Sequence, residues 1–127
     1  LTYDDAFDLL GGAKDCIQKI KAARAINNAR NNARKGAVSK AWKQEKEMVD
    51  KTGVGSRPWS QAQRDELKKT GKVKGYEGHH TNNVKDHPEM AGDPNNIRFV
   101  DRNEHYVAHG GDWRNPTSGP LIDRSIQ

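Results

Sequence analysis

Apolar residues in the first half of the chain recur every three or four positions, which predicts amphipathic helix. Thr2 is placed to cap the start of this helix, whereas Gly11 and Gly12 weaken it or break it in two. Gly36 predicts a break before a second helix. The first helix has the apolar positions Phe7, Leu10, Ala13, Ile17, Ile20 and Ala23, and the second has Val38, Ala41, Trp42 and Val49.

The pattern changes after residue 53. Residues 53–58 contain Gly, Ser and Pro and predict a linker. Ser60 and Gln63 then have the spacing of a capping box, which predicts a helix that passes through Leu67 and ends at Gly71. A further short helix is therefore expected directly after the linker.

The remaining chain predicts a strand, a long loop, a second strand and a helix. The strands are expected at residues 72–77 and 97–100, where apolar residues are frequent and partly alternate with polar ones, with residues 81–96 as the loop. Asp101 and Glu104 form a second capping box at the start of the last helix. Helices together with a strand pair predict an α+β fold. Trp113 is the expected anchor of the irregular C-terminal segment.

Composition limits the size of the core and points to a polyanionic partner. Only 32% of the 127 residues are apolar, so one modest domain is expected. Residues 1–58 carry 12 Lys and Arg residues against 7 Asp and Glu residues, a net charge of +5, whereas residues 59–127 carry ten of each and are neutral. A basic segment beside a neutral half suits nucleic acid, although a solvated helix face is the simpler reading. The single cysteine, Cys16, excludes an internal disulfide.

Four of the five histidines cluster in the sequence at positions that suit metal chemistry. His79 and His80 are adjacent, and His105 and His109 have the spacing that places two rings on one helix face. Imidazole is both a frequent metal ligand and a frequent general base. Adjacent residues of an extended chain face opposite ways, so His79 and His80 are not expected to bind one ion together. A catalytic metal site, a structural zinc site and the absence of a metal are the three readings of this pattern.

The stretch around these histidines resembles the ββα-metal (HNH) nucleases. It is similar to the colicin-type DNases and, over a wider stretch, to the GHH toxin domains of Rhs and YD-repeat proteins, a group to which the C-terminal domain of animal teneurins is related. The resemblance runs from about Trp59 to Trp113. Its matching segments are Trp59-Ser60, Glu66-Leu67, Gly71-Lys72-Val73, Gly75 to His80, Asn96-Ile97 and His105 to Gly111. It implies a nuclease core at residues 59–127, whereas composition alone predicts a basic, mainly helical region at residues 1–58.

The resemblance also implies a role for each site residue. His80 becomes the general base, with the alternative that His79 and His80 exchange roles. Asn96 becomes the residue that holds the loop and the base, with Asn95 as its competitor, and Glu77 takes a supporting role. The metal ligands become His79, His105 and His109, which would hold one divalent ion such as Zn, Mg, Mn or Ni. His87 is expected to be an ordinary loop residue, and Trp42 and Trp59 to be packing residues.

The implied activity is hydrolysis of DNA phosphodiester bonds by an antibacterial effector. The resemblance implies release from a larger Rhs-type protein, delivery by a route such as type VI secretion, action in the target-cell cytoplasm and neutralisation by an acidic immunity protein. An RNase toxin with the same site and a non-catalytic, teneurin-like binding module are the alternatives. No stretch is apolar enough to predict a membrane span. The residues expected to contact nucleic acid are Lys74, Arg98, Arg24, Arg30 and Arg34.

Overall fold

The computed structural model describes residues 3–124 of the chain, with side chains from residue 14 onward. The chain divides into two compact units, Leu1–Asn32 and Ala33–Gln127. The first unit is built from the N-terminal part of helix α1, and the second contains all the other elements. The fold is α+β, as the sequence predicts.

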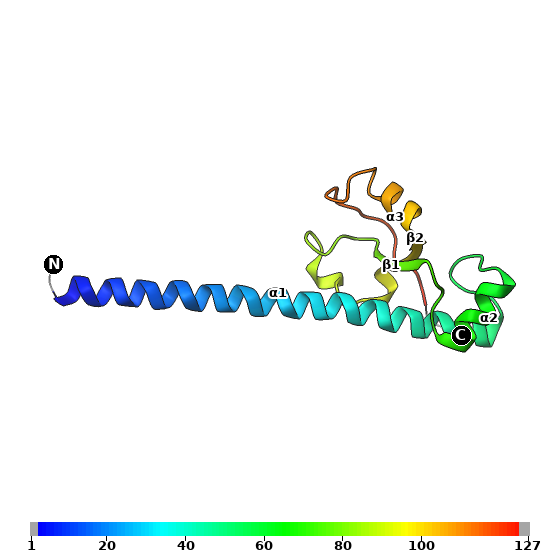
Figure 1. The fold of residues 1–127 in the computed structure, drawn as a ribbon, viewed down its shortest axis with the longest axis horizontal. Coiled ribbons are helices and arrows are strands. Elements are labelled where there is room, and N and C mark those ends of the chain that lie inside the picture. Colours follow the sequence, from blue (N-terminus) through cyan, green and yellow to red (C-terminus); the bar gives the residue numbers. More distant parts are fainter. Residues whose placement is uncertain (1–2, 125–127) are drawn as a thin grey trace. The chain divides into compact units, whose positions relative to one another are not determined.

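Helix α1 runs without interruption from Tyr3 to Thr52 (Figure 1). The predicted breaks at Gly11-Gly12 and at Gly36 are therefore wrong, and the predicted cap Thr2 lies outside the described residues. A glycine costs a helix only about 1 kcal/mol. Gly36 is followed by a helix face that buries Ala37, so packing outweighs this cost. Within residues 3–124, no helix combines the length and the apolar character that crossing a bilayer requires.

Two short helices and a strand pair complete the second unit. Helix α2 (Gln61–Thr70) begins with the predicted capping box of Ser60 and Gln63 and ends at Gly71, which has φ +82°. Helix α3 (Arg102–Ala108) begins with the second predicted capping box, that of Asp101 and Glu104. Strands β1 (Tyr76–His80) and β2 (Ile97–Asp101) pair antiparallel, and two 3-10 turns, η1 (Pro88–Met90) and η2 (Pro94–Asn96), lie in the loop between them.

Strand β1 begins later than predicted. The expected span, residues 72–77, is mostly a turn in which Gly75 has φ +86° and the backbone N–H of Lys74 donates to Glu66 Oε2 at 2.6 Å. This turn moves the strand towards His79 and His80, which form its last two residues. The histidine pair is consequently held by the sheet rather than by a loop.

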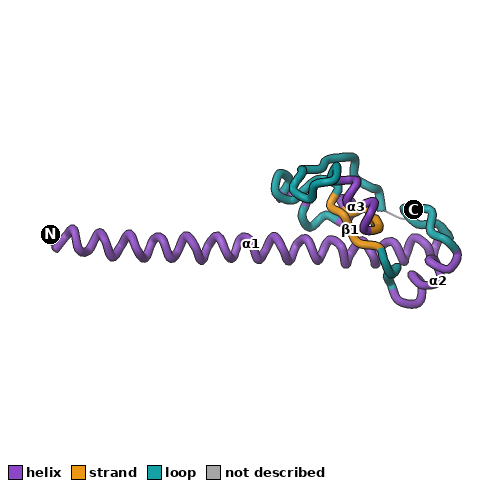
Figure 2. The backbone as a smooth tube through the Cα atoms, turned by 45° about the horizontal axis from the view of Figure 1, so that its top comes forward, coloured by secondary structure: helices purple, strands orange, loops and turns teal. Residues whose placement is uncertain are grey.

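The sheet packs against the second half of α1, as Figures 1 and 2 both show. Trp42 of α1 stacks on Phe99 of β2 with ring centroids 3.8 Å apart, and Trp59 is 3% exposed beside them. A Cβ atom at Gly78 would lie 2.9 Å from the Val38 side chain. Gly78 is therefore required for the close approach of β1 to α1, and Trp42 and Trp59 are packing residues, as predicted.

A buried ion pair anchors the C-terminal segment. Arg124 and Glu45 of α1 have fully buried side chains and form a salt bridge. Glu45 also accepts hydrogen bonds from Trp59 Nε1 at 2.8 Å and from the backbone N–H of Ser56 at 2.6 Å. Arg124 additionally donates to the carbonyl of Ile97 at 2.6 Å. Arg124 is thus the anchor of this segment, and Trp113, the expected anchor, is 40% exposed.

Replacing Arg124 with methionine should lower the free energy of unfolding by about 3–5 kcal/mol, because the Glu45 carboxylate would stay buried without its counter-charge. Urea denaturation measures this loss. Lys46→Met is the matched control, since it removes an exposed ion pair with Asp50 on the same helix and should cost about 0.5 kcal/mol or less. Similar losses in the two variants would show that the buried pair has no special role in stability.

Candidate metal centre and its cleft

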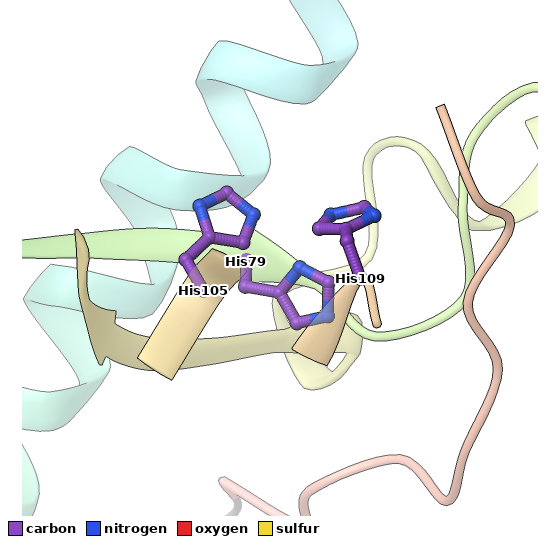
Figure 3. Close-up of side chains that lie close together, drawn as sticks. All are labelled: His79, His105 and His109. Carbon is purple, nitrogen blue, oxygen red and sulfur yellow. The ribbon is translucent and has the colours of Figure 1, made fainter. Parts of the chain in front are cut away.

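Three imidazoles from two elements converge at one end of the sheet. His79 comes from β1, whereas His105 lies in α3 and His109 follows it at the helix end (Figure 3). One ring nitrogen of each residue lies within 4.8 Å of those of the other two. His79 is 5% exposed and the other two are half-buried. This is an arrangement in which three side chains could hold one metal ion.

Hydrogen bonds at the Nδ1 atoms fix the orientation of two of these rings, those of His105 and His109. His105 Nδ1 lies 2.6 Å from Glu77 Oε1, and His109 Nδ1 lies 3.0 Å from the carbonyl oxygen of Asn115. A carboxylate and a carbonyl can only accept, so each Nδ1 carries the proton. The Nε2 lone pairs of both rings are therefore left for a metal. Carboxylate and carbonyl partners of this kind are common behind metal-bound histidines.

His79 is kept in the form that binds metals. Burial, followed by the charges of His105 and His109, lowers the pKa of His79 from 6.5 to about 4. The ring is therefore neutral at neutral pH, as a metal ligand must be. A set of three imidazole ligands fits a divalent transition metal such as Zn or Ni and leaves coordination positions for other ligands, whereas Mg prefers oxygen ligands.

His80 faces the same cleft but has a different partner. Its Nε2 lies 3.1 Å from the carbonyl oxygen of Ala91, so Nε2 donates and Nδ1 keeps a free lone pair. Burial lowers the pKa of His80, the hydrogen bond to Ala91 opposes this shift, and the charge of Arg34 adds to it. A neutral imidazole with an oriented, free nitrogen can accept a proton.

Asn96 supports the loop that carries the Ala91 carbonyl. It is completely buried, and its side-chain oxygen accepts from the backbone N–H of Asn82 at 2.8 Å. Its side-chain nitrogen donates to the carbonyl of Asn82 at 3.0 Å and to that of Met90 at 3.4 Å. Asn96 does not line the cleft, so any effect it has on His80 passes through the loop backbone. Asn95 makes backbone contacts instead: its N–H donates to Asp93 at 2.9 Å, and its carbonyl accepts from the N–H of Ile122 at 2.7 Å.

Replacing Glu77 with glutamine should weaken metal binding by about 10- to 100-fold, because the partner of His105 Nδ1 would lose its negative charge. Isothermal titration calorimetry with Zn²⁺ measures the affinity. Glu89→Gln is the control, since Glu89 is an exposed carboxylate that lies 3.5 Å from His87, a histidine outside the cluster. Unchanged affinity in Glu77→Gln would mean that the contact with His105 does not serve a metal.

The basic residues singled out in the sequence do not all reach this cleft. The cleft has a volume of about 540 Å³, and Arg34 is the one of the five that lines it. Arg98 is exposed on β2 opposite His79, and Lys74 is exposed in the turn before β1. Arg24 and Arg30 belong to the first unit. His87 directly precedes η1 and lies outside the histidine cluster.

Several residues that line the cleft were not predicted from the sequence as site residues. Lys85 and Arg114 supply positive charge from two loops, and Trp113 adds an aromatic ring. The Asn115 carbonyl that holds His109 also comes from a loop. These residues belong to segments without periodicity, so only the folded chain brings them to the histidines.

Comparison with known proteins places the chain in a family. Residues 24–101 match the model of Tox-GHH, described as a GHH signature containing HNH/Endo VII superfamily nuclease toxin. The match covers more than half of the chain. This chain belongs to the Tox-GHH family. The matched residues include Glu77, His79, His80 and Asn96, and they end before His105 and His109.

Curated relatives of this Tox-GHH chain include teneurins. It is 36% identical to mouse Teneurin-3 over 72 residues, 57% of the chain, and 32% identical to human Teneurin-1 over 78 residues, 61% of the chain. Fruit fly (Drosophila melanogaster) Teneurin-m is 34% identical over 68 residues, or 54% of the chain. The matched residues span only 2–3% of the length of these relatives. The likeness therefore concerns one small region of very large proteins.

Proposed function

We propose that this chain is a metal-dependent endonuclease toxin that hydrolyses phosphodiester bonds of DNA. The observation that carries the proposal is that one cleft contains both a candidate metal site and a separate candidate base. Three imidazoles share one centre, while His80 lines the same cleft with its free Nδ1 and a separate backbone partner. A structural zinc site would use a fourth protein ligand and would not need such a base. Membership of a nuclease toxin family supports the same reaction class.

In the proposed reaction His80 activates water. Its Nδ1 accepts a proton from the water, whose oxygen bonds to phosphorus while the bond from phosphorus to the 3′ oxygen breaks. The Ala91 carbonyl holds the His80 ring during this transfer. When bound at His79, His105 and His109, a divalent ion supplies positive charge for the phosphate oxygens and the leaving oxygen. Glu77 holds His105 in place, and Asn96 holds the loop behind His80.

The proposed DNA contacts follow the positive charge. Arg34 lines the cleft, so it is the first candidate to contact a phosphate near the scissile bond. Lys74, Arg98, Arg24 and Arg30 are proposed as further phosphate contacts, because they are basic and form no ion pair within residues 14–124. Such contacts release counterions and make binding weaker at high salt.

The biological setting is part of the proposal. A domain of a nuclease toxin family suits an effector that is released from a larger Rhs-type polypeptide and acts in the cytoplasm of a target cell. The producing cell would then need an immunity protein. A net charge of +5 favours an acidic one, since complementary charge speeds association.

A plasmid assay tests the proposal against both alternatives. Supercoiled plasmid and a long RNA are incubated with the protein and Zn²⁺, Ni²⁺, Mn²⁺ or Mg²⁺, each with and without EDTA. The proposal expects plasmid cleavage that EDTA abolishes. Degradation of RNA alone would indicate an RNase. The likeness to teneurins makes a non-catalytic module the other candidate, and binding of DNA without cleavage under any metal would support it.

A further inference from the structure

Trp113 lies at the edge of the histidine cluster with much of its surface exposed. Its ring centroid is 4.8 Å from that of His105 and 5.5 Å from that of His109. It lines the cleft and is 40% exposed, whereas Trp42 and Trp59, the other two tryptophans, are 5% and 3% exposed. The large apolar ring of Trp113 is therefore placed beside the candidate metal centre and is accessible to a molecule in the cleft.

The neighbours of Trp113 hold it in position and add positive charge. The guanidinium of Arg102 lies 4.9 Å from the Trp113 ring centroid, and the exposed ring of Tyr106 lies 5.4 Å away. Arg102 also lies 3.8 Å from Glu77, the carboxylate that orients His105. Across the same cleft, Lys85 and Arg34 supply further positive charge. An aromatic surface among cations is the combination that binds single-stranded nucleic acid.

We infer that Trp113 is a base-stacking residue and that the cleft takes a strand that is unpaired next to the scissile phosphate. The inference rests on the proposed nuclease function and specifies its substrate as single-stranded or locally unpaired DNA. In a continuous duplex both faces of each base are covered by neighbouring bases, so a tryptophan at the cleft can stack only on a base that has left the helix. Stacking does not depend on base identity, and cleavage is therefore expected to have little sequence preference.

The fluorescence of Trp113 tests the inference without any cleavage. In EDTA, a short mixed-sequence single-stranded DNA is titrated into the protein, and the same strand annealed to its complement is titrated separately. Because Trp42 and Trp59 are buried, stacking at Trp113 should quench the emission with single-stranded DNA and much less with duplex. Trp113→Phe should lose the quenching while keeping most of the affinity, since phenylalanine retains an aromatic face.

The Trp113→Leu variant distinguishes stacking of a base on Trp113 from packing of Trp113 against His105 and His109. It should weaken binding of the single strand in EDTA by about 5- to 150-fold, the factor that corresponds to the loss of one base–aromatic stack, and should change duplex binding little. With metal present, KM for the single strand should rise more than kcat falls. Zn²⁺ affinity should match that of the wild type, because Trp113 contacts His105 and His109 without being a ligand.

Three results would overturn the inference. The first is wild-type affinity of Trp113→Leu for the single strand, and the second is quenching that persists in Trp113→Phe. The third is a loss of Zn²⁺ affinity in Trp113→Leu that accounts for the whole loss of cleavage, since the residue would then only pack against the ligands. Failure of the nuclease proposal is distinct, because plasmid and single-stranded DNA would then both stay intact with every metal tested.

Discussion

Replacing His80 with alanine should lower the cleavage rate by roughly 10²–10⁴-fold, the usual cost of removing a general base. The metal affinity of this variant should stay at the wild-type value, because His80 is directed to the Ala91 carbonyl rather than to the three-histidine cluster. Plasmid cleavage at saturating metal measures the first quantity, and Zn²⁺ calorimetry measures the second. The combination of lost catalysis with intact metal binding is what identifies a base.

Two further variants make this result specific. His79→Ala should lose metal binding, since His79 is the buried member of the cluster. His87→Ala should change neither quantity, because His87 is a half-buried loop residue that pairs with Glu89. If His80→Ala lost the metal and His79→Ala kept it, the roles of the two adjacent histidines would be exchanged.

The elements that the sequence predicts correctly are those determined by local interactions. Both capping boxes, that of Ser60 with Gln63 and that of Asp101 with Glu104, connect residues only three positions apart, and both form as expected. The αL residue Gly71 ends α2 for an equally local reason. Such features depend on backbone groups near the residue itself, so a single sequence contains enough information to place them.

The elements that the sequence predicts wrongly depend on tertiary contacts. Gly36 is a helix breaker by propensity, but the neighbouring face of α1 is buried in the core, and the helix continues. The start of β1 depends on the turn that Glu66 stabilises from the preceding helix α2, through a side-chain contact that hydrophobic periodicity does not reveal. The pair of Glu45 and Arg124 joins residues 79 positions apart, and neither residue type predicts burial.

The candidate site shows the same division. The spacing of His105 and His109 predicts two neighbouring rings, which α3 and its C-cap residue supply, and the resemblance of the sequence to nucleases adds His79 and Glu77. The contact of Glu77 with His105 joins residues 28 positions apart, and the Ala91 carbonyl behind His80 lies 11 positions away. Trp113, Lys85 and Arg114 enter the cleft from loops without a sequence pattern. The candidate site residues could thus be proposed from the sequence, whereas the residues that orient and surround them required the fold.

Replacing either His105 or His109 with alanine should remove metal binding and cleavage together. Each variant leaves two imidazoles, which do not form a complete ligand set for a catalytic site. The effect also appears in stability, because a ligand bound only to the folded state adds about 2.7 kcal/mol to the free energy of unfolding at 100 times its dissociation constant. Thermal unfolding with and without Zn²⁺ should show this increment in the wild type and not in either variant.

Val107→Ala is the matched control for these two variants. Val107 lies on α3 between the two histidines, is 66% exposed and does not line the cleft. Its replacement should change the free energy of unfolding by no more than about 0.5 kcal/mol. The stabilisation that Zn²⁺ adds should be the same as in the wild type. The experiment concerns the part of the site that the family match does not reach, since that match ends at residue 101. Full activity of His105→Ala or His109→Ala at low metal concentration would exclude the three-histidine centre, even if the His80 variant behaved as expected.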